Sequence, residues 1–334
     1  MAPDLLRAMQ TPALAMLLGR TASSNTSHFD AFARALPHER WFGQATGLQA
    51  NSDCPGLSPA VEALRHFGLA PDEGFWFMVH PVHLHVARDH LVLTDPRRLA
   101  LDDAAARALF EAIAPICRDY GHDLRYGDTN TWFLRADDWH DLQTATPDAS
   151  CGHNIDIWMP QGETAVDWRK LQNEIQMHWH DHHANQQREE AGFLTVNSVW
   201  LWGGASASAS PVQPIFDAAF NLSGWMQTAA GCVAEQLYDD ATATNIFNNP
   251  AMHKLLLLDQ LLEASLGEDL GEWLLRIQSL EQEWFTPLLQ ALKNGVLTSC
   301  TLVLTNSTMY KELRLTRQSL RKFWHRPALT ALRT

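Results

Sequence analysis

The sequence predicts an α/β fold: a mixed, mostly parallel central sheet that is flanked by helices and extended by β-hairpins. Three observations predict it. A helical stretch beginning at residue 168 leads into residues 194–202, which are mostly apolar and rich in β-branched and aromatic side chains, as in a strand buried on both faces. A run of small residues, 203–210, follows that strand, as at the ligand-binding edge of open α/β sheets. Apolar segments separated by short polar turns predict the hairpins.

Residues 1–143 are predicted to form an N-terminal α+β half. Thr11 is the expected N-cap of the first helix, because threonine caps helices well and Pro12 suits the first helical position. Apolar periodicity predicts further helices over 30–36, 59–67 and 102–121. Strands are expected over 75–79, 83–86, 91–94, 124–126 and 131–134, with a hairpin turn at Arg88-Asp89.

Residues 144–166 carry prolines and glycines and are the best candidate for a connecting segment. Residues 167–334 then form the C-terminal α/β half, and we expect the two halves to pack as one compact unit. Helices of this half are predicted over 168–191, 222–229 and 272–292, the first ending at Gly192. Its strands are predicted over 194–202, 215–220, 255–258, 301–304 and 312–315, the last two forming a hairpin.

The composition excludes several functional classes. With 46% hydrophobic and 19% charged residues, the 334-residue chain is typical of a globular protein. Its formal net charge of −13 repels phosphate backbones and anionic bilayers, so we expect neither nucleic acid nor a membrane as a partner. The five cysteines are scattered and form no CxxC pair, and the N-terminal residues do not resemble a secretory signal. These features predict a cytoplasmic protein without a disulfide framework.

The segment 168–204 concentrates the polar chemistry of the chain. Six residues recur at three- and four-residue steps and so share one helical face: Leu171, Glu174, Ile175, His178, His182 and Asn185. On that face His178 and His182 stand one turn apart and Glu174 one turn earlier, a spacing at which two imidazoles bind one zinc or iron ion. The competing interpretation is a partly exposed, histidine-rich helix end. We expect no cofactor, with a single divalent metal at these three residues as the alternative.

A second group of polar residues indicates an anion-binding site. Arg188 offers a planar guanidinium for a carboxylate or phosphate, and Gly203-Gly204 lets backbone N–H groups approach an anion closely. Asn197 and Ser198 are polar residues within an apolar strand, so they either tie strands together or face a ligand. The predicted ligand-binding residues are Asn185, Arg188, Asn197, Ser198, Trp200, Gly203 and Gly204. The alternative is that this polar set only fastens the helix to the strand.

The order of these residues resembles a known family. The stretch LQNEIQM, then His182, Asn185, Arg188 and Gly192, then VNSVWLWGG, is similar to the central motif of bacterial cofactor-independent phosphoglycerate mutase-like proteins, also described as Rpf-type regulatory proteins. The resemblance extends through PVHLHVARDHLVL, WFTPLLQALKNG and FWHRP and so covers most of the chain. The HxxNxxR and NSxWxWG pieces also resemble archaeal-type phosphoglycerate mutases of the alkaline phosphatase superfamily.

This resemblance implies a degenerate alkaline-phosphatase-like fold, but the sequence departs from the family pattern. Only ten residues precede Thr11, so we do not expect the strand that supplies a metal-binding aspartate in the superfamily. Asp and His sets at the spacing of the two-metal centre are also not found, and two-metal phosphoryl transfer needs such carboxylates. His183 stands where the pattern has Pro, and Ala205 stands where it often has a third Gly.

We therefore expect a phosphoglycerate-mutase-like regulatory or binding protein that lacks two-metal phosphotransfer. Its expected ligand is a small anionic or phosphorylated metabolite, and a protein partner is also considered. Arg188 would hold the phosphate or carboxylate, and His182 would donate a hydrogen bond to it. The alternative is an active phosphotransferase or phosphatase of the mutase type, in which His182 serves as acid or base in the region of Arg188.

Overall fold

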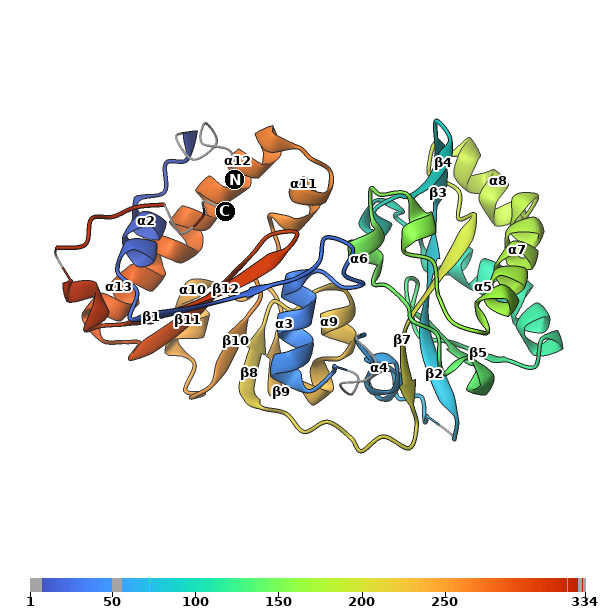
Figure 1. Cartoon of the computed structure of the whole chain (residues 1–334), viewed down its shortest axis with the longest axis horizontal. Helices are drawn as coiled ribbons and strands as arrows, with labels where there is room; N and C mark the ends of the chain where they lie inside the picture. Colours follow the sequence, from blue (N-terminus) through green and yellow to red (C-terminus); the bar gives the residue numbers. More distant parts are fainter. Residues whose placement is uncertain (1–7, 50–55, 72, 323, 330–331, 333–334) are drawn as a thin grey trace. The chain divides into compact units, whose positions relative to one another are not determined.

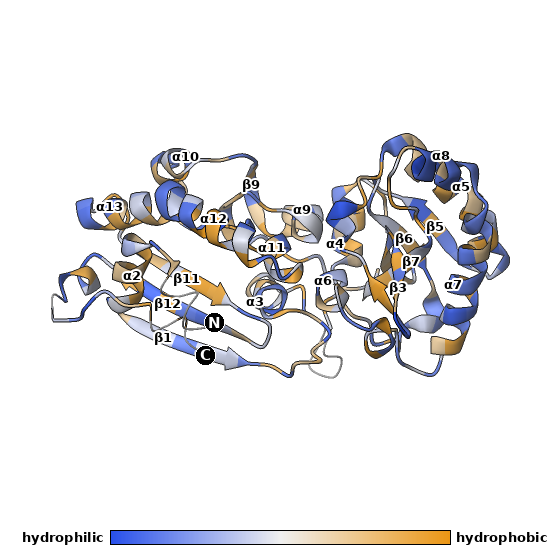
Figure 2. Cartoon of the chain, turned by 90° about the horizontal axis from the view of Figure 1, so that it is seen from above, coloured by the Kyte–Doolittle hydropathy of each residue, from blue (hydrophilic) through white to orange (hydrophobic). Residues whose placement is uncertain are grey.

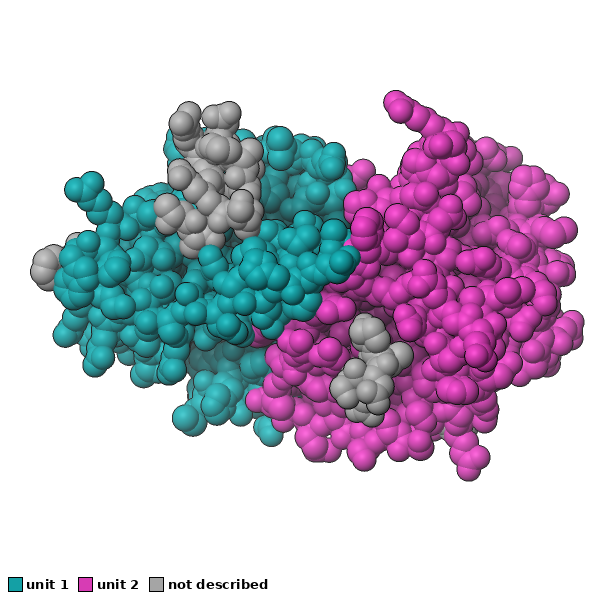
Figure 3. Space-filling view, viewed as in Figure 1, with its two compact units in different colours: residues 1–31, 216–223, 234–334 teal, residues 32–215, 224–233 magenta. Residues whose placement is uncertain are grey.

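The computed structural model describes residues 8–49, 56–71, 73–322, 324–329 and 332 (Figure 1). Contacts group the chain into two compact units (Figure 3). Unit 1 comprises residues 1–31, 216–223 and 234–334, and unit 2 comprises residues 32–215 and 224–233. Each unit therefore takes segments from both sides of the predicted connecting segment 144–166, which itself lies inside unit 2.

The largest sheet of unit 2 has four strands, in the order β5 (Asp123–Tyr126), β6 (Trp132–Arg135), β2 (Phe75–Val82) and β7 (Ser198–Ser206). All three of its pairings are antiparallel, so the predicted mostly parallel central sheet is wrong here. The prediction failed because it took an uninterrupted apolar run as evidence for parallel pairing. Consecutive residues of β7 are buried, which means that both faces of the strand are covered, and two-sided burial gives the same pattern in an antiparallel sheet.

The described part of unit 2 also contains helices before, between and after these strands. They are α3 (Pro37–Thr46), α4 (Ala60–His66), α5 (Asp103–Asp119), α6 (Pro147–Ser150), α7 (Ala165–His180), α8 (His183–Glu190) and α9 (Gly224–Thr228). Short 3-10 turns lie at Pro96–Arg98, Asp137–Trp139, Ile155–Ile157 and Ala230–Cys232. Helix α7 packs on β7 and on α5, whereas α4 packs on both β2 and β7. In Figure 2, α7 and α8 are largely hydrophilic, while β7 carries hydrophobic residues.

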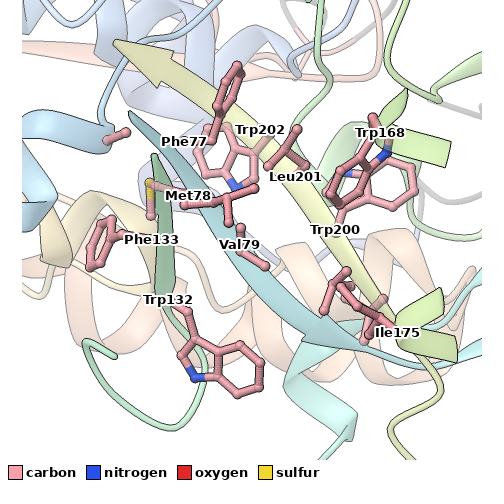
Figure 4. Packing of buried hydrophobic residues seen from close by; sticks show 14 of the residues in the cluster. Phe77, Met78, Val79, Trp132, Phe133, Trp168, Ile175, Trp200, Leu201 and Trp202 are labelled. Atoms are coloured by element: carbon pink, nitrogen blue, oxygen red, sulfur yellow. The ribbon is translucent and has the colours of Figure 1, made fainter. Parts of the chain in front are cut away.

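The largest side chains in the core of unit 2 are aromatic. Trp132 meets Trp179 edge to face at 6.0 Å between ring centroids, and Trp139 meets Trp168 at 5.9 Å. Figure 4 shows how the labelled side chains of β2, β6, β7 and α7 gather in this core. The predicted hairpin is confirmed as β3 (Leu84–Ala87) and β4 (His90–Leu93), with Arg88 in the left-handed region at φ 58°.

The helix predicted over 30–36 is wrong, because the helix in this region begins at Pro37. Proline disfavours the helical conformation in the residue before it, and Leu36 is accordingly extended, with ψ 154°. Proline itself fits the first turn of a helix, where its missing N–H has no intrahelical acceptor. The polar residues before it form part of unit 1 instead, as strand β1 (Ser23–His28).

Unit 1 contains two three-stranded sheets. One is antiparallel, with β12 (Met309–Thr316) between β1 and β11 (Ser299–Thr305), which confirms the predicted C-terminal hairpin. The other is parallel, with β8 (Phe216–Phe220) between β10 (Lys254–Leu256) and β9 (Ala234–Tyr238). The remaining helices are α2 (Pro12–Gly19), α10 (Ala243–Asn248), α11 (Leu262–Leu266), α12 (Leu270–Leu280) and α13 (Thr286–Asn294), with a 3-10 turn at Ser319–Arg321.

The predicted long helix 272–292 is present but contains a π-helical turn, Glu281–Phe285, between α12 and α13. Glu281 in that turn is buried, and its carboxylate accepts the backbone N–H groups of Ala13 at 2.5 Å and Leu14 at 3.1 Å. Thr11 occupies the predicted N-cap position, yet its side chain makes no capping hydrogen bond. A distant carboxylate therefore caps α2 in place of the local threonine.

Two further expectations concern the chain as a whole. Cys117, Cys151, Cys232 and Cys300 form no disulfide in the described part of the chain, whereas Cys54 lies outside the described residues. Within the same described ranges, none of the helices has the length and apolarity that a membrane span requires.

Candidate functional site

The predicted helical face of the central motif is interrupted. Helix α7 ends at His180, and α8 begins at His183, with His182 extended between them at ψ 134°. The Nδ1 atom of His182 accepts a hydrogen bond from the backbone N–H of Ala184 at 3.3 Å, so this side chain caps α8. Burial, and secondarily the neighbouring His183, lower the pKa of His182. This imidazole is therefore neutral and holds a helix terminus.

The three residues considered for a single metal do not gather. Glu174 and His178 lie 4.0 Å apart on the exposed side of α7, each with about half of its side chain accessible: 47% and 53%, respectively. His182 belongs to the cap of the next helix. In the described parts of the chain, one group of three metal-ligating side chains has all its ligand atoms within 4.8 Å, and it contains none of these residues.

Asn185 connects three segments of the motif. Its Nδ2 donates to the carbonyl oxygens of Trp179 and Val196, both at 2.8 Å, and its Oδ1 accepts the N–H of Val196 at 2.8 Å. The side chain is 3% exposed. The bond to Trp179 satisfies a carbonyl in the last turn of α7, and the bonds to Val196 fix the chain just before β7. The amide thus fastens helix to strand.

Arg188 also fastens separate segments of the chain, through three backbone carbonyl groups. Its Nε donates to the carbonyl of Leu194 at 2.9 Å, its Nη1 to that of Ala100 at 3.3 Å, and its Nη2 to that of Leu99. The residue is 4% exposed, and burial lowers the pKa of its guanidinium. Ala100 is held in the left-handed region at φ 47°, an uncommon conformation for a residue with a Cβ. The guanidinium fork is engaged by backbone carbonyls rather than open to an anion.

The polar residues at the start of β7 also pair with neighbours. Asn197 exchanges two hydrogen bonds with the backbone of Leu84, at 2.7 and 2.8 Å, and so ties β7 to the hairpin. The Ser198 hydroxyl accepts from the amides of Gln172 and Gln176 on α7 at 3.2 and 2.9 Å. The two glutamines, which belong to the LQNEIQM stretch, therefore lock the helix to the strand.

The other strand residues of the predicted site face structural partners as well. The indole N–H of Trp200 donates to the carbonyl of Ala145 at 2.8 Å. Gly203 and Gly204 lie inside β7 rather than in a loop, and the N–H of Gly203 donates to the Thr144 hydroxyl at 3.2 Å. Gly203 lies six residue steps along the chain from Asn197, or about 20 Å in an extended strand. The structure therefore does not bring Arg188 and the two glycines to one hollow.

Packing explains the second glycine. A Cβ on Gly204 would lie 2.6 Å from ring atoms of both Phe75 and Phe77. We expect Gly204→Ala to lower the free energy of unfolding by about 1–3 kcal/mol, because overpacking forces these rings to shift. Chemical unfolding measures this loss. Gly231→Ala is the control, since a Cβ there meets no atom within 4 Å, and its stability should stay within about 0.5 kcal/mol of wild type. Equal stability of both variants would contradict the packing role.

A hollow of about 580 Å³ lies beyond the end of β7. Its polar lining comes from Glu73, Arg135, Asp137, His140, Ser206 and Ser208. Arg135 pairs with Asp137 through two nitrogens, Nε at 3.1 Å and Nη2 at 2.8 Å, which lowers the pKa of that carboxyl. The hydroxyls of Ser206 and Ser208 lie 2.8 Å apart. The small-residue run that was predicted as a ligand loop borders this open hollow, which is lined by Arg135 and not by Arg188.

A buried carboxylate that the sequence did not reveal lies elsewhere in unit 2. Glu39 is fully buried on the first turn of α3, and its Oε2 accepts from the backbone N–H of Leu36 at 2.8 Å and the hydroxyl of Thr146 at 2.6 Å. Its Oε1 accepts from the indole of Trp225 at 3.0 Å. Burial and the nearby charge of Asp148 raise the pKa of Glu39 to about 8. The pattern Leu36-Pro37-His38-Glu39 signals a helix start, but nothing local shows what faces it.

The resemblance implies a two-metal centre, which requires enough metal-ligating side chains close together. Two ions about 3.5–4 Å apart need a set of carboxylates and imidazoles around both of them. Within the described ranges, the group of three metal-ligating side chains that meets the 4.8 Å distance consists of His38, Glu39 and Asp148. Three donors do not furnish a two-ion centre, so the described residues do not fit that group, and we derive no phosphoryl-transfer step through it.

The chain is distantly related in sequence to a curated protein. No protein-family model matches the chain. A curated relative, the probable 2,3-bisphosphoglycerate-independent phosphoglycerate mutase of Geobacter sulfurreducens, is 28% identical over 161 residues, which are 47% of this chain and 39% of the relative. The chain therefore spans about two-fifths of that relative and is a distant homologue of such a mutase over this segment.

Comparison with solved structures gives two distant matches. The PH0037 protein from Pyrococcus horikoshii has a TM-score of 0.50 at 11% identity, covering 93% of this chain and 81% of that one. The cofactor-independent phosphoglycerate mutase from Thermoplasma acidophilum has a TM-score of 0.42 at 13% identity, covering 97% and 88%. At this identity the first of these shows a shared fold alone, and the relationship to a mutase rests on the sequence match over 47% of the chain.

Proposed function

We propose that this chain is a phosphoglycerate-mutase-like regulatory protein that binds a small anionic metabolite without transferring its phosphoryl group and signals the bound state to a protein partner. The observation that carries the proposal is the use of the motif residues. Arg188, Asn185 and Asn197 bond backbone groups of adjacent segments, so the side chains that resemble a mutase motif hold the scaffold together. In this proposal the chain keeps the mutase-like scaffold but does not transfer a phosphoryl group.

The hollow beyond β7 is the ligand site that we assign to this function. Arg135 and His140 provide cationic and hydrogen-bonding groups, and two serine hydroxyls provide further donors. Glu73 and Asp137 add two negative charges, which disfavour bare inorganic phosphate. A hydroxy acid matches this lining better, because its hydroxyls can donate to the carboxylates while its acid group accepts from the serine hydroxyls and competes with Asp137 for the Arg135 guanidinium.

A thermal-shift series tests the assignment. We expect glycerate to raise the melting temperature of the wild-type protein more than equal inorganic phosphate does, and we expect Arg135→Ala to remove the effect. Arg107→Ala is the matched control, since Arg107 is exposed and pairs with Asp103 on the surface of α5. A wild-type response in Arg135→Ala, or no response to any hydroxy acid, would exclude this site.

An active mutase-type enzyme is the second candidate, because the curated relative is named as a probable mutase. It would use His182 as acid or base near Arg188. Mutase and phosphatase assays with added Mn²⁺ separate the two functions. Turnover that disappears in a folded His182→Ala variant would establish the enzyme, whereas we expect no turnover above that of this variant.

A further inference from the structure

Three metal-ligating side chains from two distant segments meet in unit 2. His38 and Glu39 are the second and third residues of α3, and Asp148 is the second residue of α6. Each helix begins with a proline, which places these side chains in first turns. One ligand atom of each residue lies within 4.8 Å of the others. Ligand atoms at tetrahedral angles on one ion, at about 2.0–2.2 Å each, lie about 3.3–3.6 Å apart, so a closing movement of at most about 1.5 Å is needed.

Three carboxylates and the guanidinium of Arg97 lie in or beside this group. Asp95 and Asp148 both pair with Arg97: its Nε lies 2.8 Å from Asp95, and its Nη2 lies 2.9 Å from Asp148. Glu39 adds a third carboxylate, and its three hydrogen-bond donors are all neutral. Because Glu39 is 0% exposed and Asp95 only 8%, water screens this excess of negative charge poorly. A bound cation would offset it, in place of the proton that Glu39 holds when no cation is bound.

Both carboxylates keep acceptor capacity toward such a cation. Each carboxylate oxygen has two lone-pair positions. The Oε1 of Glu39 accepts one hydrogen bond, from Trp225, and each oxygen of Asp148 accepts one from Arg97. Existing bonds therefore orient both carboxylates, as outer-shell partners do for metal ligands. His38 and Asp148 are partly exposed, which gives an ion and its remaining water ligands a route in.

We propose that His38, Glu39 and Asp148 bind one divalent transition-metal ion, with water completing its coordination. One imidazole and two carboxylates suit Zn²⁺ or Mn²⁺, whereas Mg²⁺ and Ca²⁺ prefer sets made of oxygen alone. This site is separate from the Glu174, His178 and His182 face of α7. Its ion fastens α3 to α6, since each helix contributes at least one ligand.

Metal analysis of the full-length protein tests the site. After chelator treatment and dialysis against Zn²⁺, the wild type should retain one equivalent, and Asp148→Asn and His38→Gln should each weaken Zn²⁺ binding in calorimetry by at least about tenfold. Zinc should also raise the melting temperature of the wild type but not of these variants. His178→Gln is the matched control, because it removes an imidazole from the exposed face of α7, and its binding should equal that of the wild type.

Coordination and folding are checked separately. The zinc absorption edge of the loaded protein should show nitrogen and oxygen ligands at about 2.0–2.2 Å. His38 is partly exposed, so His38→Gln should fold and keep the circular dichroism spectrum of the wild type. This variant therefore tests the site even if a substitution of the buried Glu39 prevents folding. Absence of stoichiometric zinc, or zinc binding that His178→Gln removes and Asp148→Asn retains, would overturn the site.

Discussion

Arg188→Met should lower the free energy of unfolding by about 3–5 kcal/mol, because the guanidinium donates to the carbonyls of Leu99, Ala100 and Leu194. Methionine preserves most of the side-chain volume but has no donor, so three backbone acceptors lose a charged partner at a position that is 4% exposed. Urea unfolding at neutral pH measures the loss. Arg107→Met, at an exposed ion pair, should change stability by less than about 1 kcal/mol.

The same pair of variants distinguishes a structural arginine from a ligand-binding one. If Arg188 held an anion, its removal would leave stability nearly unchanged, or raise it by relieving a buried charge, and would abolish the response to phospho-acids. If it fastens segments, stability falls while any response at the hollow near Arg135 remains in the folded fraction. Arg188→Lys should be intermediate, because one ammonium cannot reach three carbonyls that diverge around a planar fork.

Local signals in the sequence predicted many of the elements. Thr11-Pro12, Gly192 and Arg88-Asp89 mark ends and turns through backbone preferences that do not depend on distant contacts. Strands β1 and β9 were missed because their sequences, SSNTSH and AEQLY, lack a continuous apolar pattern. Their pairing with β12 and β8 supplies the stability that their own propensity does not.

The local sequence pattern could not predict the direction of neighbouring strands or the hydrogen-bond partners of the motif residues. An apolar run records burial of two faces but not the direction of the neighbouring strand, which is why β7 was expected in a parallel sheet. The polar residues Asn185 and Arg188 were recognised, but the same donors suit an anion or a carbonyl. Only the position of Leu99 and Ala100, far away in the sequence, decides which of these they meet.

The group around Glu39 could not be predicted from the sequence either, because its members are neighbours only in the folded chain. A glutamate at the third position of a helix is common, since it favours the helix dipole and can cap the preceding backbone N–H. Thr146, Asp148 and Trp225 become its neighbours only in the folded chain. No periodicity or spacing links those residues, because they belong to three different segments of unit 2.

Glu39 should make the stability of chelator-treated protein fall as pH rises. Burial and the Asp148 charge raise its folded-state pKa to about 8, whereas an unfolded glutamate titrates near 4.5. Between these values the folded chain holds a proton that the unfolded chain has released. The contribution is therefore complete below about pH 4.5 and is lost through about pH 8, with a slope of up to about 1.4 kcal/mol per pH unit.

The pH range 6.5–8 isolates this effect. Burial lowers the pKa values of His80, His122 and His182, so their contributions change with pH below about 6.5, where the unfolded imidazoles take up protons. Buried thiols such as Cys117 have raised pKa values and matter above about pH 8.5. Urea unfolding of wild type and Glu39→Gln across the range should give a decline in wild type that the variant lacks. Parallel curves would mean that Glu39 is ionised in the folded chain, with its charge balanced by the surrounding donors.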